Sequence, residues 1–132
     1  MSVSSDPIAD LLARLRNASH GRKNEFTVPY SKIKSDILHI LKREGYIGDV
    51  ALDTSKAHPV LKVRAKYVNR SSAIAGLRRI SRPGLRKYVG SKCIPIVLGG
   101  MGVALLSTPQ GILTGQEARR RNVGGEILAY VW

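Results

Sequence analysis

The sequence predicts an α+β fold made of two small α/β domains, and three observations support this assignment. Helix and strand patterns alternate in the first half of the chain. The second half holds short strand patterns separated by glycine and proline turns, with one short helix pattern. A polar stretch at residues 69–72 separates the two halves. Alternating elements favour helices packed on a small sheet, and short strands with tight turns favour an antiparallel sheet.

The chain opens with a helix pattern. Asp6 is a favourable cap and Pro7 suits the first helical position. Apolar residues at i, i+3, i+4 and i+7 form one stripe along this helix: Ile8, Leu11, Leu12 and Leu15. Arg14 and Arg16 are expected in its last turn, where a cation suits the helix dipole. Each of these two arginines has two interpretations, a solvated side chain or a contact to a phosphate.

A strand, a second helix and two more strands follow. Residues 25–28 read as a strand, Ser31 as the cap of the second helix, and Gly45 as its stop. Residues 46–52 form the next strand pattern. Residues 60–67 alternate apolar with basic side chains, which predicts a half-buried antiparallel strand with a basic solvent face. The first half is therefore αβαββ.

The start of the second half has weaker patterns. Residues 73–80 fit a strand or a helix, and we favour a strand. Residues 81–84 carry Pro then Gly at the centre of a predicted type II turn. Residues 85–89 are then expected to return as the second strand of a hairpin. Residues 91–98 are ambiguous, with room for one helical turn.

The end of the second half has clearer signals. Strand patterns at 103–107 and 112–113 flank a Ser-Thr-Pro-Gln-Gly turn. Thr114 and Glu117 match a capping box, in which each side chain satisfies the other's backbone N–H. The helix that they start is expected to reach about residue 122, and residues 126–132 form a closing strand.

The charge balance points to a polyanionic partner. The 132 residues hold 22 Lys and Arg against 9 Asp and Glu, a net charge of +13. The second half, residues 71–132, is the more one-sided, because Glu117 and Glu126 are its only acids. Neutralising phosphates releases counterions, which favours binding of a basic protein to nucleic acid. The alternative is a basic protein that its charge merely keeps in solution.

The sequence offers no catalytic or metal centre. Cys93 is the only cysteine, so no intrachain disulfide can form, and a reducing cytosolic setting fits. The three histidines are scattered, and Ser107 has no base at a suitable spacing. No apolar run is long enough for a clean membrane span, since Pro95 and three glycines break the longest uncharged stretch. We expect a soluble protein without cofactor or metal.

Two features of the second half each have two interpretations. The Gly124-Gly125-Glu126 segment is either a helix stop with an acid that neutralises nearby arginines, or a place where RNA backbone approaches and the carboxylate accepts hydrogen bonds. Tyr88 is either an aromatic at the edge of the core or a ring on which an unpaired base stacks, worth about 1–3 kcal/mol.

Several blocks in order resemble one protein family over the full length of the chain. They are Asp6-Pro7-Ile8-Ala9-Asp10 with Arg14, Arg16 and Asn17; the Ser81–Arg86 turn; Gly102–Ala104, Ser107-Thr108 and Gly111; Glu117-Ala118-Arg119; Gly124-Gly125-Glu126; and Tyr130-Val131. On these residues the chain is similar to the bacterial ribosomal protein S8 family, a protein of the small ribosomal subunit.

The resemblance implies a domain organisation and a set of contacts. Residues 1–68 would be an N-terminal domain with secondary RNA contacts, 69–72 a linker, and 73–132 the main rRNA-binding domain. The implied partners are the central domain of 16S rRNA, neighbouring small-subunit proteins and, in bacterial members, a ribosomal-protein messenger; no membrane and no homo-oligomer are expected. The implied RNA-binding residues are Arg14, Asn17, Lys32, Arg86, Tyr88, Ser107, Thr108, Gly111, Gly124, Gly125 and Glu126.

The chain departs from the family pattern at three places. Pro109 and Gln110 stand in the turn where many members carry other polar residues, and proline removes an N–H there. Ala129 stands where many members have Cys. Trp132 is an additional aromatic at the end, expected to pack on the domain surface.

The sequence thus predicts a structural rRNA-binding protein without catalysis, which supports assembly of the small subunit. One alternative is an RNA-processing enzyme with Glu126 as general base, which lacks a second acid, base or metal. Another is a nonspecific nucleic-acid binder, whose affinity depends on salt alone.

Overall fold

The computed structural model describes residues 6–132, which divide into two compact units. One unit is Pro7–Ala75, and the other combines Asp6 with Gly76–Trp132. Helices and antiparallel sheets occur in both units, so the predicted α+β class is confirmed. The predicted division into a first domain at 1–68, a linker at 69–72 and a second domain at 73–132 stays a prediction. Residues 1–5 of the first predicted domain lie outside the described residues.

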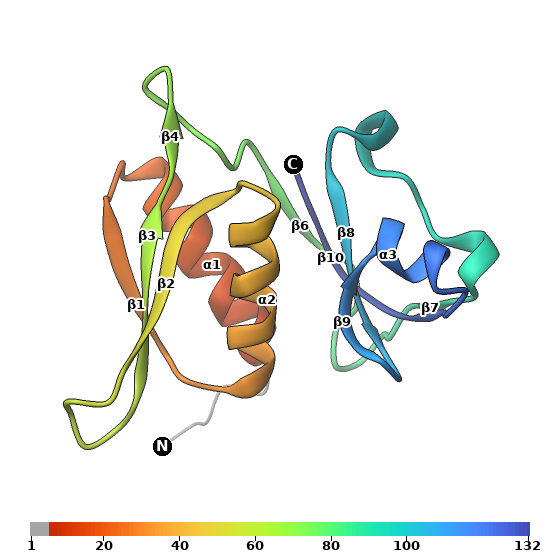
Figure 1. Cartoon of the computed structure of the whole chain (residues 1–132), viewed down its shortest axis with the longest axis horizontal. Coiled ribbons are helices and arrows are strands. Elements are labelled where there is room, and N and C mark those ends of the chain that lie inside the picture. The colour runs from red at the N-terminus through yellow and green to blue at the C-terminus, as the bar shows by residue number, and fades with distance from the viewer. Residues whose placement is uncertain (1–5) are drawn as a thin grey trace. The chain divides into compact units, whose positions relative to one another are not determined.

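The first unit places two helices on one side of a three-stranded sheet (Figure 1). All strand pairs are antiparallel, and β3 is central in the order β1-β3-β2. The elements are α1 (Pro7–His20), β1 (Glu25–Pro29), α2 (Lys32–Arg43), β2 (Ile47–Asp53), β3 (Val60–Ala65) and a short ladder of β4 (Tyr67–Val68) with β5 (Ser71–Ser72).

The predicted apolar stripe forms the buried face of α1. The helix is longer than the sequence analysis expected, because Ala18 continues the stripe and is buried. The backbone N–H of Gly21 donates to the Asn17 carbonyl (2.9 Å) where the helix ends. The expectation that Arg14 and Arg16 lie in the last turn was therefore wrong, and both lie further inside the helix.

The second helix and the strand after it follow their sequence signals. The Ser31 hydroxyl accepts from the Lys34 N–H (3.2 Å), which confirms the cap, and Gly45 adopts φ +86° after the helix. On β3, Leu61 and Val63 are buried, while Lys62 and Arg64, which alternate with them, are exposed. The αβαββ order is confirmed.

The second unit contains an antiparallel sheet whose strands differ in length, with β10 between β6 and β8 (Figure 1). The order is β6-β10-β8-β9, and β7 also pairs with β10. The elements are β6 (Leu77–Arg79), β7 (Tyr88–Val89), two 3₁₀ turns η1 (Ser91–Cys93) and η2 (Val97–Gly100), β8 (Val103–Thr108), β9 (Gly111–Thr114), α3 (Gly115–Arg120) and β10 (Gly125–Val131). A buried cluster on one face of the sheet comprises Ile94, Val97, Ala104, Leu106, Leu113, Ala118 and Ile127.

The predicted hairpin at 73–89 is wrong. Of residues 73–80 only β6 is a strand, and β7 does not pair with it. Both strands instead pair with β10, β6 along 129–131 and β7 along 125–126. Arg82 and Leu85 do close a turn with two backbone hydrogen bonds (3.0 and 2.9 Å). It is not type II, because the φ of Gly84 is outside the positive range which that turn requires.

The helix and closing strand keep their predicted character with adjusted ends. Thr114 and Glu117 form the capping box, with hydrogen bonds of 3.2 and 3.1 Å. The helix α3 stops at Arg120, short of residue 122, because Asn122 adopts φ +61°. The strand β10 contains a register shift between Ile127 and Ala129.

The last residue packs back onto the unit. Trp132 and Gly76 exchange two backbone hydrogen bonds (2.9 and 3.0 Å), and a Cβ at Gly76 would overlap the indole ring. Within residues 6–132 no helix has the length and apolar character needed to cross a membrane.

Candidate nucleic-acid interface

Three of the predicted site residues stand side by side across the second sheet. Glu126 on β10 lies directly opposite Tyr88 on β7 and opposite Ser107 on β8. Directly opposed residues of an antiparallel pair point to the same face. Their chain neighbours Leu106 and Ile127 belong to the buried cluster. The Tyr88–Glu126–Ser107 row therefore lies on the face opposite that cluster.

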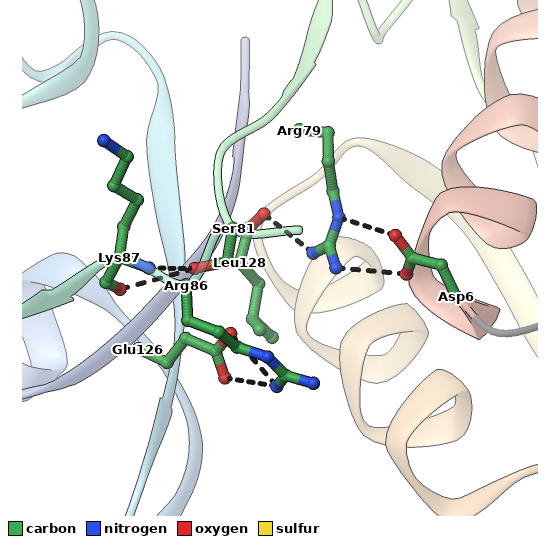
Figure 2. Close-up of polar contacts among 7 residues, drawn as sticks. All are labelled: Asp6, Arg79, Ser81, Arg86, Lys87, Glu126 and Leu128. Atoms are coloured by element: carbon green, nitrogen blue, oxygen red, sulfur yellow. Dashed lines mark hydrogen bonds and ion pairs between the residues drawn. The ribbon is translucent and has the colours of Figure 1, made fainter. Parts of the chain in front are cut away.

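The side chains of this row differ in exposure. Tyr88 is 69% exposed, so it is not an aromatic packed into the edge of the core. The Glu126 side chain is 12% exposed, and both of its carboxylate oxygens lie 3.4 Å from Nη1 of Arg86 (Figure 2). Arg86 itself is half exposed. The row thus presents the exposed aromatic ring of Tyr88 and a carboxylate that the Arg86 guanidinium holds in place.

Gly124 and Gly125 allow the strands to approach closely. A Cβ at Gly125 would overlap the Ser107 carbonyl oxygen on β8. A Cβ at Gly124 would overlap the Val89 carbonyl oxygen and come within 2.8 Å of the Gly90 Cα. Glycine at these two positions therefore makes room for backbone atoms of the same chain. The sequence had suggested other roles for the two glycines, a helix stop or the approach of RNA backbone.

The β8–β9 turn is closed by a hydroxyl. Thr108 Oγ1 donates to the Gly111 carbonyl (2.8 Å) and accepts from the Gln110 N–H (3.1 Å). Gly111 adopts φ +104°, a conformation that side chains disfavour. Pro109 provides no N–H, and the turn is closed through Thr108 and Gln110 instead. Thr108 and Gly111 lie opposite each other at the tip, one residue beyond Ser107.

The carboxylates of the second unit all have partners within residues 6–132. Asp6 binds the Arg79 guanidinium (3.0 Å), Glu126 binds Arg86, and Glu117 accepts from the Thr114 backbone. The exposed basic side chains greatly outnumber these acids; they include Arg82, Lys87, Lys92, Arg120 and Arg121. The surface of this unit is therefore positive, as an anionic partner requires.

The predicted site residues of the first unit form a smaller group. Arg14 and Asn17 line a shallow pocket of about 140 Å³ with Lys23, Phe26 and Thr27. The Arg14 guanidinium is also engaged within the unit, with the Asp10 carboxylate (3.1 Å) and the Thr27 carbonyl (3.0 Å). Lys32 is outside this pocket, and its largely exposed side chain lies 3.5 Å from Asp36.

Ser81 was predicted only as a turn residue, with no role in the site. This serine is fully buried although it precedes an Arg-Pro-Gly turn, a setting in which serine is normally exposed. Its hydroxyl accepts from the Lys87 N–H (2.8 Å) and donates to the Lys87 carbonyl (3.4 Å), as Figure 2 shows. Nothing in the local sequence distinguishes it from an exposed turn residue.

Metal binding has no support in the part of the chain that the structure describes. No three or more His, Cys, Asp or Glu side chains gather there as a metal site would require.

The comparisons with known proteins all indicate one family. The family model of ribosomal protein S8 matches residues 6–132. The small ribosomal subunit protein uS8 of Corynebacterium glutamicum is 52% identical over 129 residues, covering 97% of this chain and 98% of that protein. The protein of the same name from Persephonella marina is 53% identical over 134 residues, with 97% and 98% covered. That of Lacticaseibacillus casei is 51% identical over 131 residues, with 98% and 99% covered.

Proposed function

This chain belongs to the ribosomal protein S8 family, and we propose that it binds small-subunit rRNA directly through the Tyr88–Glu126–Ser107 row and the turns beside it. The family is one of structural proteins, so the chain is a structural protein of the small ribosomal subunit, located with it in the cytoplasm. The alternative of an RNA-processing enzyme does not hold.

The chemistry of the row suits irregular RNA. A-form RNA hides its base edges in a deep major groove, and proteins read its shallow minor groove, its 2′-hydroxyls and its unpaired bases. Glu126 accepts hydrogen bonds from a ribose hydroxyl or a base amine, Ser107 both donates and accepts, and the exposed Tyr88 ring offers a stacking surface. The shared register of these three residues is the observation that carries the proposal.

The neighbouring residues add position and charge. Thr108 and Gly111 form the tip next to Ser107, and Gly124 and Gly125 keep β7, β10 and β8 close together. Arg86 adds a positive charge next to Glu126 of the row. In the first unit, Arg14, Asn17 and Lys32 would add phosphate contacts, with the pocket at Arg14 and Asn17 as one contact point.

The target in this proposal is an irregular internal loop in the central domain of 16S rRNA, and binding it supports subunit assembly. Neighbouring small-subunit proteins are the further partners. A messenger segment that imitates the rRNA loop would fit the same surface, and its binding would repress translation.

A binding titration at two salt concentrations tests the proposal. One RNA is a hairpin carrying the internal loop, and the other is a hairpin of equal length in which paired bases replace the loop. We expect the looped RNA to bind about a hundredfold more tightly at both salts, about 3 kcal/mol. If both RNAs bind equally and weaken together as salt rises, the chain is a nonspecific basic binder and the proposal fails.

A further inference from the structure

A buried hydroxyl lies next to the predicted RNA site. Ser81 is 0% exposed, and only Lys34 and Thr114 join it as buried polar residues among residues 6–132. A buried hydroxyl needs hydrogen-bond partners, because water cannot reach it. Ser81 finds both partners on one residue, Lys87, by accepting from its N–H (2.8 Å) and donating to its carbonyl (3.4 Å).

These bonds close a loop of five residues, 82–86. Backbone bonds hold both ends of the loop to β10, since the Ser81 N–H donates to the Ile127 carbonyl (3.1 Å) and the Ile127 N–H donates to the Lys87 carbonyl (2.9 Å). The two hydrogen bonds between Arg82 and Leu85 tighten the tip. Ser81, Lys87 and Ile127 thus form a closed triangle at the base of the loop.

The triangle sits beside the row. Lys87 is flanked on one side by Arg86, which holds the Glu126 carboxylate (Figure 2). On its other side is Tyr88, which lies opposite Glu126. Ile127 directly follows Glu126 in the chain. The strand β7 has only two residues, fewer than strands usually have. The Ser81 side-chain bonds to Lys87 add a further constraint next to this short pairing.

From this geometry we infer that Ser81 is a positioning residue of the RNA site, which sets Arg86 and Tyr88 against Glu126 without touching RNA itself. This inference rests on the proposed function. Preorganised contacts bind more tightly because less ordering is required when the partner arrives. Loss of the Ser81 hydroxyl therefore lowers affinity for the looped RNA even where the protein remains folded.

The test compares Ser81→Ala with Thr114→Ala. Both variants remove a buried hydroxyl that accepts a backbone N–H in the same unit, but Thr114 caps α3 rather than the loop. Each protein is titrated with looped and paired hairpins at a temperature where both are fully folded. We expect Ser81→Ala to bind the looped RNA about tenfold more weakly and Thr114→Ala within about twofold of the original, with equal salt dependence.

Hydrogen exchange supplies a second readout. The Lys87 amide should exchange faster in Ser81→Ala and remain protected in Thr114→Ala. Ser81→Cys, whose thiol is a weaker partner at the same place, should give intermediate affinity and exchange, and it replaces Ser81→Ala if that variant does not fold.

The outcomes separate the two proposals. If the original protein does not distinguish looped from paired RNA, the proposed function fails. If the original protein distinguishes them and Ser81→Ala or Ser81→Cys binds as Thr114→Ala does, Ser81 contributes only to stability and the positioning role is wrong.

Discussion

The two sheets of this protein carry basic residues in contrasting surroundings. On the first sheet, Arg64 of β3 lies opposite Glu25 of β1 and next to Asp49 of β2, and Lys62 is 3.7 Å from Asp53. The predicted basic solvent face of β3 is therefore interleaved with acids from both neighbouring strands. On the second sheet, Glu126 is the only acidic side chain, and a ring and a hydroxyl flank it in its row.

The difference shows that net charge alone does not locate a binding surface. Residues 1–70 hold 13 basic and 7 acidic residues, and residues 71–132 hold 9 and 2, so the net charges of the halves are nearly equal. The register decides which cations face an acid within their own sheet. We expect the first sheet to tolerate substitution with little effect on RNA recognition, whereas the second sheet should not.

The largest effect is expected where the second sheet is most tightly packed. Gly125→Ala places a methyl group on the Ser107 carbonyl and forces β8 away from β10. Overpacking of this kind costs about 1–3 kcal/mol, and we expect the upper end because backbone atoms must move. Chemical denaturation measures the loss of unfolding free energy.

Gly90→Ala is the matched control for that substitution. A Cβ at Gly90 meets nothing within 4 Å, and the φ of −79° suits alanine. Its unfolding free energy should stay within about 0.5 kcal/mol of the original. Equal losses in the two variants would show that the close approach of the strands has no role in stability.

The second effect concerns RNA recognition. Ser107→Ala combined with Glu126→Ala removes two members of the row, and specific binding should weaken by about 2–3 kcal/mol. Stability and the salt dependence of binding should change little, because Glu126 has a single ion pair with the half-exposed Arg86. The looped and paired hairpins measure the change.

The first sheet supplies the control pair for this experiment. Glu25 on β1 and Thr54, directly after β2, also present a carboxylate and a hydroxyl at exposed positions. Glu25→Ala combined with Thr54→Ala should leave the preference for looped RNA intact. A loss as large as that of the Ser107 and Glu126 variant would mean that the row is not the reading surface.

The first sheet was also the easier one to predict from the sequence. Its signals are local: the apolar stripe of α1, the Ser31 cap and the alternation along β3 all act within a few residues. The capping box at Thr114 in the second unit was found for the same reason. Such signals depend on neighbours in the chain, and so a single sequence contains them.

The second sheet depends on contacts between distant residues, which periodicity does not encode. The sequence patterns of β6 and β7 predict a hairpin, yet both strands pair with β10, which is more than 35 residues away from either of them in the chain. Burial of Ser81 and the close approach at Gly125 follow from that register. The sequence offered Tyr88 and Glu126 as possible RNA contacts, and the family resemblance added Ser107, but only the structure places the three residues in one row.

A smaller effect on RNA affinity is expected when an arginine that faces a carboxylate is replaced, and it should differ between the two sheets. Arg86→Ala removes the group that holds Glu126 and should weaken binding of looped RNA by about 1–2 kcal/mol. Arg64→Ala removes an exposed cation between two acids of the first sheet and should cost less than about 0.5 kcal/mol. Parallel titrations of the two variants measure the difference, and equal losses would remove the distinction between the sheets.

The smallest effect is the acid response of the first sheet. A hydrogen bond from the Lys42 side chain, then one from the Val50 N–H, lowers the pKa of Asp49, and hydrogen bonds from the Ser55 hydroxyl and N–H lower the pKa of Asp53. A carboxyl whose pKa is lower in the folded than in the unfolded chain stabilises the fold above its unfolded pKa of about 3.9. That contribution disappears as pH falls through the folded pKa.

The double variant Asp49→Asn and Asp53→Asn tests this contribution by denaturation at pH values between about 5 and 2. Its unfolding free energy should fall less over that interval than that of the original protein, because two of the titrating groups are gone. At neutral pH the same variant leaves Lys42 and Lys62 without their carboxylate partners. Paired RNA should then bind slightly more tightly, while the preference for looped RNA stays unchanged. An unaltered acid response would mean that these acids do not stabilise the first sheet, and an altered preference would place specific recognition on it.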